Sequence, residues 1–486
     1  MIEFRDVTFF YGEETAPSVD GVSLKIDKGE TVVLCGESGC GKSTMTRLIN
    51  GLIPHFHEGK LEGEVLYDGK RTTDMRLYEL SEHVGSVFQD PRTQFYNVES
   101  TVELAFGCEN LGVPPEEIEQ RITRTATRFG LEELLDRNLF AMSGGEKQRI
   151  ACGSVDAINP ETLVLDEPSS NLDLFAIHDL AQVVQRWRDD GKTLVIAEHR
   201  IFYLVDLADR FIYIRDGRIE REFRPDELRT LSPEALEDLG LRAPDPWKLA
   251  PRAEARGSGE SLSLRSLKCI TRGRRRLSIP ELTLPRGEII AVIGRNGAGK
   301  TTLARTLCGL EKTGSGVLGI DGATHDIRKR RDLVYMVMQD VNHQLFTEDV
   351  ISELLLSMDG TDPDAEQKRA MEILRSLDLD DKSGRHPMSL SGGEQQRVAI
   401  GSAIAAGREI LILDEPTSGL DHKRMTQVAD YLTAMSADGK TVLVITHDIE
   451  LVLRCCSHAI YLVDGEIAQK SRMDETGAQQ LREFFE

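Results

Sequence analysis

The residues Gly36-Glu-Ser-Gly-Cys-Gly-Lys-Ser-Thr44 follow an apolar run at positions 31–35 and precede a helix-like stretch. The same pattern, G-x-x-x-x-G-K-[ST], returns as Gly294-Arg-Asn-Gly-Ala-Gly-Lys-Thr-Thr302 after the apolar run at 289–293. Glycine permits unusual dihedrals and a close approach, so backbone N–H groups can surround phosphates, and the helix N-terminus adds a favourable dipole. Strand, glycine loop and helix in this order predict an α/β domain with a phosphate site, present twice.

Three further segments occur twice, 248 residues apart in each case, which indicates an internal duplication. They are Met142-Ser-Gly-Gly-Glu-Lys-Gln-Arg149 with Leu390-Ser-Gly-Gly-Glu-Gln-Gln-Arg397, Leu163-Val-Leu-Asp-Glu-Pro168 with Leu411-Ile-Leu-Asp-Glu-Pro416, and Ile196-Ala-Glu-His199 with Val444-Ile-Thr-His447. We expect one domain at residues 1–240, the first copy, and another at 261–486, the second copy. Prolines, Gly-Ser-Gly and mixed charge make residues 241–260 a linker.

Composition limits the partners of the chain. Its 486 residues carry a formal net charge of −22, which argues against binding nucleic acid through a phosphate backbone. No run approaches eighteen apolar residues and the N-terminus lacks a signal-peptide core, so any membrane role is expected to come through a partner. None of the eight cysteines forms a C-x-x-C pair, so neither a zinc ribbon nor a disulfide scaffold is indicated.

The last residues of each glycine loop have side chains suited to a nucleotide triphosphate. In this pattern Lys42 and Lys300 are expected to contact the β- and γ-phosphates. Ser43 and Thr301 are expected to coordinate Mg²⁺. Because the pattern occurs twice in matched context, a glycine-rich turn without a ligand is a poor alternative.

Two acidic pairs follow buried, strand-like runs. Asp166 and Asp414 end apolar runs, where α/β sheets place their ligands, and each can hold the magnesium shell. The next residue, Glu167 or Glu415, can orient or deprotonate an attacking water. One Asp-Glu pair would fit a solvated turn equally well, but two pairs, each 23 residues after an SGGE segment, favour catalysis.

Both copies resemble the nucleotide-binding domains of ATP-binding cassette (ABC) transporters, on the motifs quoted above and over nearly the whole chain apart from the linker. The resemblance implies an α/β fold of two P-loop NTPase domains. Each would have a mainly parallel sheet core, an antiparallel β subdomain and a helical subdomain. It further implies that the domains pack head to tail as an intramolecular dimer with ATP and Mg²⁺ between them.

The resemblance implies two composite sites, both hydrolytic because both glutamates and both histidines are present. The first would combine Gly36, Glu37, Ser38, Gly39, Cys40, Gly41, Lys42, Ser43, Thr44, Gln89, Asp166, Glu167 and His199 with Ser391, Gly392, Gly393 and Glu394. The second would combine Gly294, Arg295, Asn296, Gly297, Ala298, Gly299, Lys300, Thr301, Thr302, Gln339, Asp414, Glu415 and His447 with Ser143, Gly144, Gly145 and Glu146. The expected catalytic residues are Glu167, His199, Glu415 and His447, and the expected magnesium ligands are Ser43, Gln89, Asp166, Thr301, Gln339 and Asp414. Asp173 and Asp421 match the cross-dimer loop of the family.

Adenine contacts are expected to differ between the sites. Tyr11 stands where the family places an aromatic ring under the base, and we favour stacking over a half-buried strand residue. The second copy offers Thr271 and Arg272 instead. The basic run at 272–276 fits a solvated hairpin better than a stacking group.

The segments after Gln89 and Gln339 resemble those of energy-coupling factor (ECF) transporters, as does the Ala197-Glu-His-Arg200 variant. The resemblance implies a peripheral ATPase at the cytoplasmic face of the cell membrane. It would grip helices of a transmembrane T component, which carries a small substrate-binding membrane subunit for vitamins or metal ions. The alternative is that these segments only pack the helical subdomain.

Other tandem ATPases remain as alternatives. Fused ATPases of sugar importers have similar length but usually a weakened second copy, whereas Glu415 and His447 are intact here. In translation factors with tandem cassettes we would expect a long, charged linker and a basic surface, whereas the linker here is short and contains prolines. DNA-repair cassettes need zinc-binding cysteine pairs, which the sequence lacks.

Overall fold

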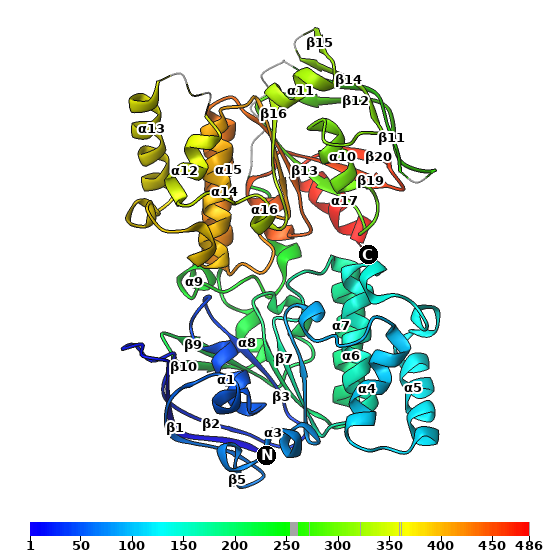
Figure 1. Ribbon diagram of the computed structural model, residues 1–486, viewed down its shortest axis with the longest axis vertical. Helices are drawn as coiled ribbons and strands as arrows, with labels where there is room; N and C mark the ends of the chain where they lie inside the picture. The colour runs from blue at the N-terminus through cyan, green and yellow to red at the C-terminus, as the bar shows by residue number, and fades with distance from the viewer. Residues whose placement is uncertain (253–260, 272, 321, 359, 361, 486) are drawn as a thin grey trace. The chain divides into compact units, whose positions relative to one another are not determined.

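The computed structural model describes residues 1–252, 261–271, 273–320, 322–358, 360 and 362–485 (Figure 1). The chain forms two compact units, residues 1–246 with 419–423 and residues 247–418 with 424–486. Residues 253–260 of the expected linker lie outside the described residues, and the expected domain boundaries stay a prediction. A short turn of 3₁₀-helix, Pro246–Lys248, lies in the described part of that linker.

A six-stranded sheet forms the centre of the first copy, in the order β10-β9-β3-β8-β7-β6. The four pairs from β9 to β6 are parallel, and β10 pairs antiparallel with β9. Every residue of β3 and β8 is buried, as expected for apolar strands covered on both faces. The strands are β3 (Thr31–Cys35), β6 (Val84–Val87), β7 (Thr162–Asp166), β8 (Thr193–Ala197), β9 (Arg210–Arg215) and β10 (Arg218–Phe223).

A second, antiparallel sheet packs beside it in the order β2-β1-β4-β5. Its buried side chains alternate along β1 and β2, so one face of the sheet faces the core. Met45 and Leu48 of helix α1 (Lys42–Ile49) join that core together with Val32 and Leu34 of β3. The strands are β1 (Ile2–Tyr11), β2 (Val19–Ile26), β4 (Gly59–Tyr67) and β5 (Lys70–Arg71).

Helices α4, α5 and α6 form the helical part of the first copy (Figure 1). Leu104 of α4, Phe129 of α5 and Ile150 of α6 belong to one buried cluster, which also contains Trp187 of α7. The helices of this copy are α1 (Lys42–Ile49), α2 (Leu52–His55), α3 (Leu77–Ser81), α4 (Ser100–Asn110), α5 (Pro115–Phe129), α6 (Gly144–Ile158), α7 (Leu174–Asp189), α8 (Pro225–Arg229) and α9 (Pro233–Asp238).

The second copy repeats this plan. Its six-stranded sheet has the order β16-β17-β18-β13-β19-β20 and its antiparallel sheet the order β12-β11-β14-β15. The strands are β11 (Ser261–Thr271), β12 (Arg274–Pro285), β13 (Ile289–Ile293), β14 (Gly314–Ile320), β15 (Ala323–His325), β16 (Val334–Val337), β17 (Ile410–Asp414), β18 (Thr441–Ile445), β19 (His458–Val463) and β20 (Glu466–Arg472). The helices are α10 (Lys300–Leu307), α11 (Ile327–Leu333), α12 (Val350–Leu356), α13 (Pro363–Ser376), α14 (Gly392–Ala406), α15 (His422–Ala437), α16 (Ile449–Cys455) and α17 (Glu475–Phe485).

The expected fold class is therefore confirmed in each copy: a mainly parallel sheet, an antiparallel sheet and a helical part. The head-to-tail packing of the two copies stays a prediction. Within the described ranges of the chain, no helix is both long and apolar enough to cross a membrane.

Candidate functional site

The glycine loop of the first copy lies between β3 and α1, and its backbone excludes larger residues. Gly36 and Gly41 have φ values of 145° and 106°, in the region that favours glycine. A Cβ atom on Gly36 would lie 2.1 Å from the carbonyl oxygen of Ile214, and one on Gly41 would lie 2.4 Å from that of Ser18. The sequence reads glycine at these positions because the loop passes directly against neighbouring main chain.

The loop lysines curl back over their own loops. Lys42 is buried, and its Nζ donates to the carbonyl oxygens of Gly36 at 3.0 Å and Glu37 at 2.9 Å. Lys300 makes the same two contacts in the second copy, to Gly294 at 2.8 Å and Arg295 at 3.2 Å. Each ammonium group is therefore fixed at the centre of a loop whose N–H groups can face an anion.

A hydroxyl and a carboxylate meet beside each loop. Ser43 Oγ donates to Oδ1 of Asp166 at 2.8 Å, and Thr301 Oγ1 donates to Oδ2 of Asp414 at 2.8 Å. Burial raises the pKa of both aspartates above the ordinary value, and the hydrogen bond from the hydroxyl opposes that rise. One hydroxyl and one carboxylate fit Mg²⁺, which is bound through one or two protein oxygens together with waters and substrate phosphates.

The glutamates after the aspartates are held in a strained conformation. Glu167 and Glu415 have φ values of 44° and 52°, which non-glycine residues rarely adopt and which cluster at functional sites. Nε2 of His199 lies 3.2 Å from Oε1 of Glu167, and Nε2 of His447 lies 3.3 Å from Oε1 of Glu415. Burial favours a raised pKa at Glu167, but the hydrogen bond with His199 and the charge of Lys42 outweigh it and hold that pKa below its ordinary value. The carboxylate is therefore kept in the ionised form that a general base requires.

The SGGE segments begin helices α6 and α14. Ser143 Oγ accepts from the N–H of Glu146, and Oε2 of Glu146 accepts from the N–H of Ser143 at 2.7 Å, which is a capping box. Ser391 and Glu394 form the same box. The structure thus gives the two glutamates a capping role. Their expected contact with nucleotide, and the pairing of each segment with the other copy's loop, stay predictions.

Tyr11 lies next to the loop of the first copy. Its hydroxyl is 3.3 Å from Oγ1 of Thr44 and accepts from Arg47 at 2.9 Å, while its ring meets that of Phe9 edge to face at 4.9 Å. The ring is thereby fixed at the edge of the phosphate loop. In the second copy Thr271 is exposed at the end of β11, and Arg272 lies outside the described residues.

Residues 19–170 and 277–418 match the family described as ABC transporter. The chain belongs to the ABC transporter family. A protein of Treponema denticola that carries the provisional name ABC transporter ATP-binding protein is 41% identical to this chain, over 97% of both chains. A Methanosarcina mazei protein of the same provisional name is 33% identical over 96% of this chain and 88% of its own. This ABC protein is accordingly an ATPase.

Solved structures share the fold of this ABC ATPase. A chain in a structure of ribosome-bound archaeal Pelota and ABCE1 superposes with a TM-score of 0.71, covering 99% of this chain and 80% of that one. Sequence identity between the two is 22%, so the likeness extends to the fold alone.

Each copy of the ABC ATPase brings most of its expected residues together. In the first copy Gln89 Nε2 donates to Oε2 of Glu167 at 2.8 Å, and Ser38 Oγ lies 3.4 Å from Nε2 of His199. The loop lysine, the Ser43–Asp166 pair and the Glu167–His199 pair all lie where β3, β7 and β8 end. The same groups meet in the second copy, except that Gln339 is exposed and has no hydrogen bond to Glu415 within the described ranges.

Sequence reasoning missed buried carboxylates that hold the surrounding loops. Glu103 and Glu353 are buried, and each accepts main-chain N–H groups from the segment after Gln89 or Gln339. Glu198 is buried beside His199. An acidic residue inside an otherwise apolar stretch, as in Val195-Ile-Ala-Glu198, is the signal that could have indicated the last of these.

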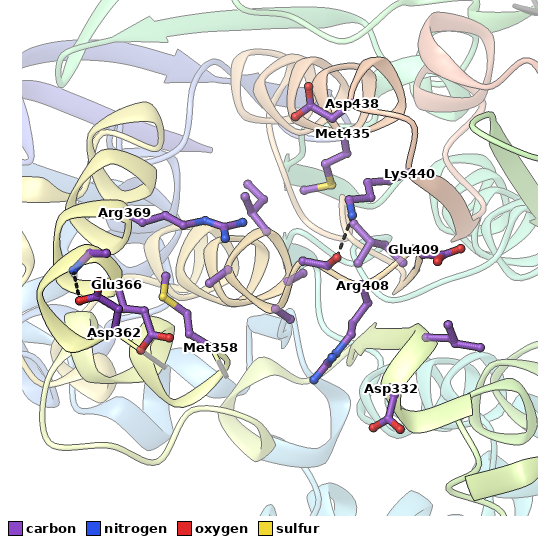
Figure 2. A pocket seen from close by; sticks show the side chains of 18 residues that line it. Asp332, Met358, Asp362, Glu366, Arg369, Arg408, Glu409, Met435, Asp438 and Lys440 are labelled. Atoms are coloured by element: carbon purple, nitrogen blue, oxygen red, sulfur yellow. Dashed lines mark hydrogen bonds between the residues drawn. The ribbon is translucent and has the colours of Figure 1, made fainter. Parts of the chain in front are cut away.

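A cavity of about 600 Å³ lies at the opposite end of the second sheet from the loop, among α13, the end of α14 and the end of α15 (Figure 2). Arg408 and Glu409, before the amino end of β17, help to line it, whereas Asp414 of the site is at the carboxyl end. Because it lies at the amino end of β17, the cavity is separate from the nucleotide site.

Met435 also lines this cavity. The residue at the corresponding position of the first copy, Trp187, is fully buried.

Proposed function

We propose that each copy binds ATP on its glycine loop and hydrolyses it at Glu167 or Glu415. The lysine and the loop N–H groups hold the β- and γ-phosphates, and the glutamate orients or deprotonates the attacking water. His199 and His447 contact the γ-phosphate and position the glutamate. Mg²⁺ held by Ser43, Gln89 and Asp166, or by Thr301, Gln339 and Asp414, would neutralise phosphate charge. Support comes from the repetition of the two contact pairs in both copies, at distances within 0.1 Å.

Each site is completed by the SGGE segment of the other copy in this proposal. Ser143 and Ser391 are exposed at the starts of α6 and α14, where two glycine N–H groups and the helix dipole suit a phosphate. Tyr11 stacks on adenine in the first-copy site. In the same proposal, Asp173 and Asp421 belong to the loops that cross between the copies.

The hydrolysis cycle drives a membrane transporter through a patch on each helical part. In the first copy this docking patch consists of Tyr96, Val98, Val102, Phe106 and Phe140. Tyr96 is 79% exposed and Phe140 is 69% exposed, and the ring of Tyr96 stacks on Phe106 at 4.9 Å. The N–H of Leu139 donates to the carbonyl oxygen of Val98 at 2.8 Å, which brings the two segments together.

The second docking patch consists of Phe346, Leu356 and Met388. They stand at the positions of Tyr96, Phe106 and Phe140 in the first copy, and they are 72%, 59% and 52% exposed. The N–H groups of Phe346 and Thr347 both donate to the buried carboxylate of Glu353, as those of Tyr96 and Asn97 do to Glu103. A buried carboxylate held by main-chain donors fixes the loop and leaves its aromatic side chain in solvent.

These paired exposed apolar residues are the observation that carries the transport proposal. Neighbouring exposed aromatics and aliphatics mark a surface for a partner. The partner we propose is an ECF-type transmembrane T component whose helices present apolar side chains, with a small membrane subunit that binds a vitamin or metal ion. This places the ATPase at the cytoplasmic face of the membrane during uptake. The names of the relatives from Treponema denticola and Methanosarcina mazei support transport.

The test is to recover the tagged chain from gently solubilised native membranes and to identify its partners by mass spectrometry. A T-type membrane protein with a small integral subunit is expected. The variant Tyr96→Asp with Phe346→Asp should lose both, because the charges would be buried at the interface. Tyr78→Asp, at an aromatic position on α3 that is 56% exposed and lies outside both patches, is the control and should keep them. Recovery of a paired sugar permease, or of ribosomal proteins without a membrane partner, would assign the chain to a different class of ABC ATPase.

A further inference from the structure

The carboxylate of Glu198 lies directly before His199 and is 2% exposed. Oε1 accepts from the main-chain N–H groups of His199 at 2.7 Å and Arg200 at 3.1 Å. Oε2 accepts from the hydroxyl of Tyr203 at 2.9 Å and the N–H of Ser169 at 3.3 Å. Four donors compensate the burial of this carboxylate, so the loop that carries His199 is anchored by a neighbour of the histidine and not by the catalytic glutamate.

The second copy anchors the equivalent loop in another way. Thr446 stands in place of Glu198, and its Oγ1 accepts from the N–H of Asp448 at 3.0 Å. The carboxylate comes after the histidine instead: Asp448 caps α16 through the N–H of Leu451 and accepts from Oγ1 of Thr417 at 2.8 Å. No carboxylate therefore comes from the residue before His447.

The difference changes what the catalytic glutamates contact. In the second copy the main-chain N–H of His447 donates to Oε2 of Glu415 at 3.4 Å, so both carboxylate oxygens face that histidine. In the first copy Glu198 takes the N–H of His199. Oε2 of Glu167 then accepts from Nε2 of Gln89 at 2.8 Å, a contact that Gln339 does not make to Glu415 among the described residues.

We propose that Glu198 is a positioning residue that makes the two ATP sites unequal. By holding the main chain of His199, it leaves one oxygen of Glu167 to Gln89, the residue that begins the segment leading to Tyr96. Hydrolysis in the first-copy site then depends on the position of that segment, and hydrolysis in the second-copy site depends on it much less. This inference rests on the catalytic roles proposed above and adds a division of labour between the sites.

The test uses the purified full chain with one site silenced at a time. Glu415→Gln leaves the first-copy site as the active one, and Glu167→Gln leaves the second-copy site. We expect Gln89→Ala to lower kcat of the first about tenfold more than Gln339→Ala lowers kcat of the second. A tenfold change corresponds to about 1.4 kcal/mol in activation free energy. Similar losses from the two glutamine variants would overturn the proposal whether or not any Glu198 variant folds.

Glu198 is then changed to Thr, the residue of the second copy, in the Glu415→Gln chain. We expect kcat to fall about tenfold with KM for ATP within about twofold, and Gln89→Ala to add little further loss, because its hydrogen bond to Glu167 is already weakened. Glu198→Gln keeps an acceptor oxygen for the two main-chain N–H groups and should restore most of the activity. Glu161→Thr makes the same change at an exposed glutamate and serves as the control.

Three results would contradict the role of Glu198: an unchanged kcat in Glu198→Thr, a loss confined to KM, or a fully additive loss with Gln89→Ala. Failure of the underlying function is distinguishable. If the chain with both Glu167→Gln and Glu415→Gln still hydrolyses ATP at the wild-type rate, the proposed catalytic roles are wrong, irrespective of Glu198.

Discussion

In the first copy Ser43 lies 2.8 Å from Asp166 and His199 lies 3.2 Å from Glu167; in the second, Thr301 lies 2.8 Å from Asp414 and His447 lies 3.3 Å from Glu415. The supports around these pairs have diverged. A buried glutamate with a tyrosine anchors one histidine loop, and a helix-capping aspartate anchors the other. The groups that would touch nucleotide therefore share one geometry, while the residues that hold them differ between the copies.

The two copies also differ in the packing of their helical parts. In the first copy, the indole N–H of Trp187 donates to Asp156 at 3.0 Å, and the ring of Trp187 meets Phe129 edge to face at 5.9 Å. Met435 and Ile404 stand at the positions of Trp187 and Asp156 in the second copy, where they line the cavity (Figure 2). Met435 and Ile404 are both apolar and cannot form the hydrogen bond that joins Trp187 to Asp156 in the first copy.

The largest expected effect comes from removing both catalytic glutamates. Glu167→Gln with Glu415→Gln should lower the steady-state ATPase rate by about 10²–10⁴-fold, because the amide cannot accept the proton of the attacking water. ATP binding should persist, which equilibrium dialysis would show as retained nucleotide. Each single variant should retain activity from the intact site. Full activity in the double variant would mean that other residues perform the proton transfer.

The second-largest expected effect is a difference in the stability lost when a core side chain is truncated in the helical part of each copy. Trp187→Ala should destabilise the first copy by about 3–5 kcal/mol, since it opens a cavity and leaves Asp156 without its indole donor. Met435→Ala should cost less, about 2 kcal/mol, because the side chain already borders empty space. Hydrogen exchange followed by mass spectrometry would report loss of protection in α6 and α7 for the first variant. Equal losses in the two copies would contradict the packing difference.

The local sequence predicts the residues of the site better than it predicts the residues that hold them in place. Glycine at 36 and 41, a lysine after them and an acidic pair after a buried strand form short patterns that can be recognised in the local sequence, although the main chain that requires the two glycines comes from Ile214 and Ser18. The anchor of His199 joins Glu198 to Ser169 and Tyr203, and this contact depends on tertiary placement. Glu146 shows a further limit: its motif predicts a nucleotide contact, which stays a prediction, but does not reveal that its carboxylate caps α6 in the fold.

Removing one magnesium-ligand hydroxyl from each copy is expected to produce a smaller change. In chains with one active site, Ser43→Ala or Thr301→Ala should raise the Mg²⁺ concentration for half-maximal hydrolysis about tenfold, the equivalent of about 1.4 kcal/mol. A magnesium titration at saturating ATP would measure it. Thr301→Ser keeps the hydroxyl and should behave like the parent chain. If Thr301→Ser also raises the Mg²⁺ concentration for half-maximal hydrolysis, the methyl group of Thr301 and not its hydroxyl is responsible for the change.

The smallest expected effect concerns the capping glutamates and their pH dependence. Burial opposes ionisation of Glu394, but its contact with Lys382 and the hydrogen bonds from Ser391 lower its pKa from an ordinary 4.5 to about 2. Because the folded-state pKa is lowered, the stabilisation is fully present above the unfolded-state pKa, and it is lost as pH falls from about 4.5 towards about 2. Glu394→Ala should therefore lower the stability of the second copy by about 1 kcal/mol at neutral pH, the usual cost of a lost helix cap.

The difference between Glu394→Ala and the parent chain should shrink as the pH of a thermal unfolding series is lowered towards 2. Glu146→Ala is the matched variant in the first copy, where Arg137 replaces Lys382 as the cationic neighbour. The side chain of Arg137 is 44% exposed and that of Lys382 is 24% exposed, so the ion pair at Glu146 is screened more strongly by water. The effect at Glu146 should consequently disappear at a higher pH than the effect at Glu394. The reverse order would show that the exposure of the cationic neighbour does not set the strength of these two caps.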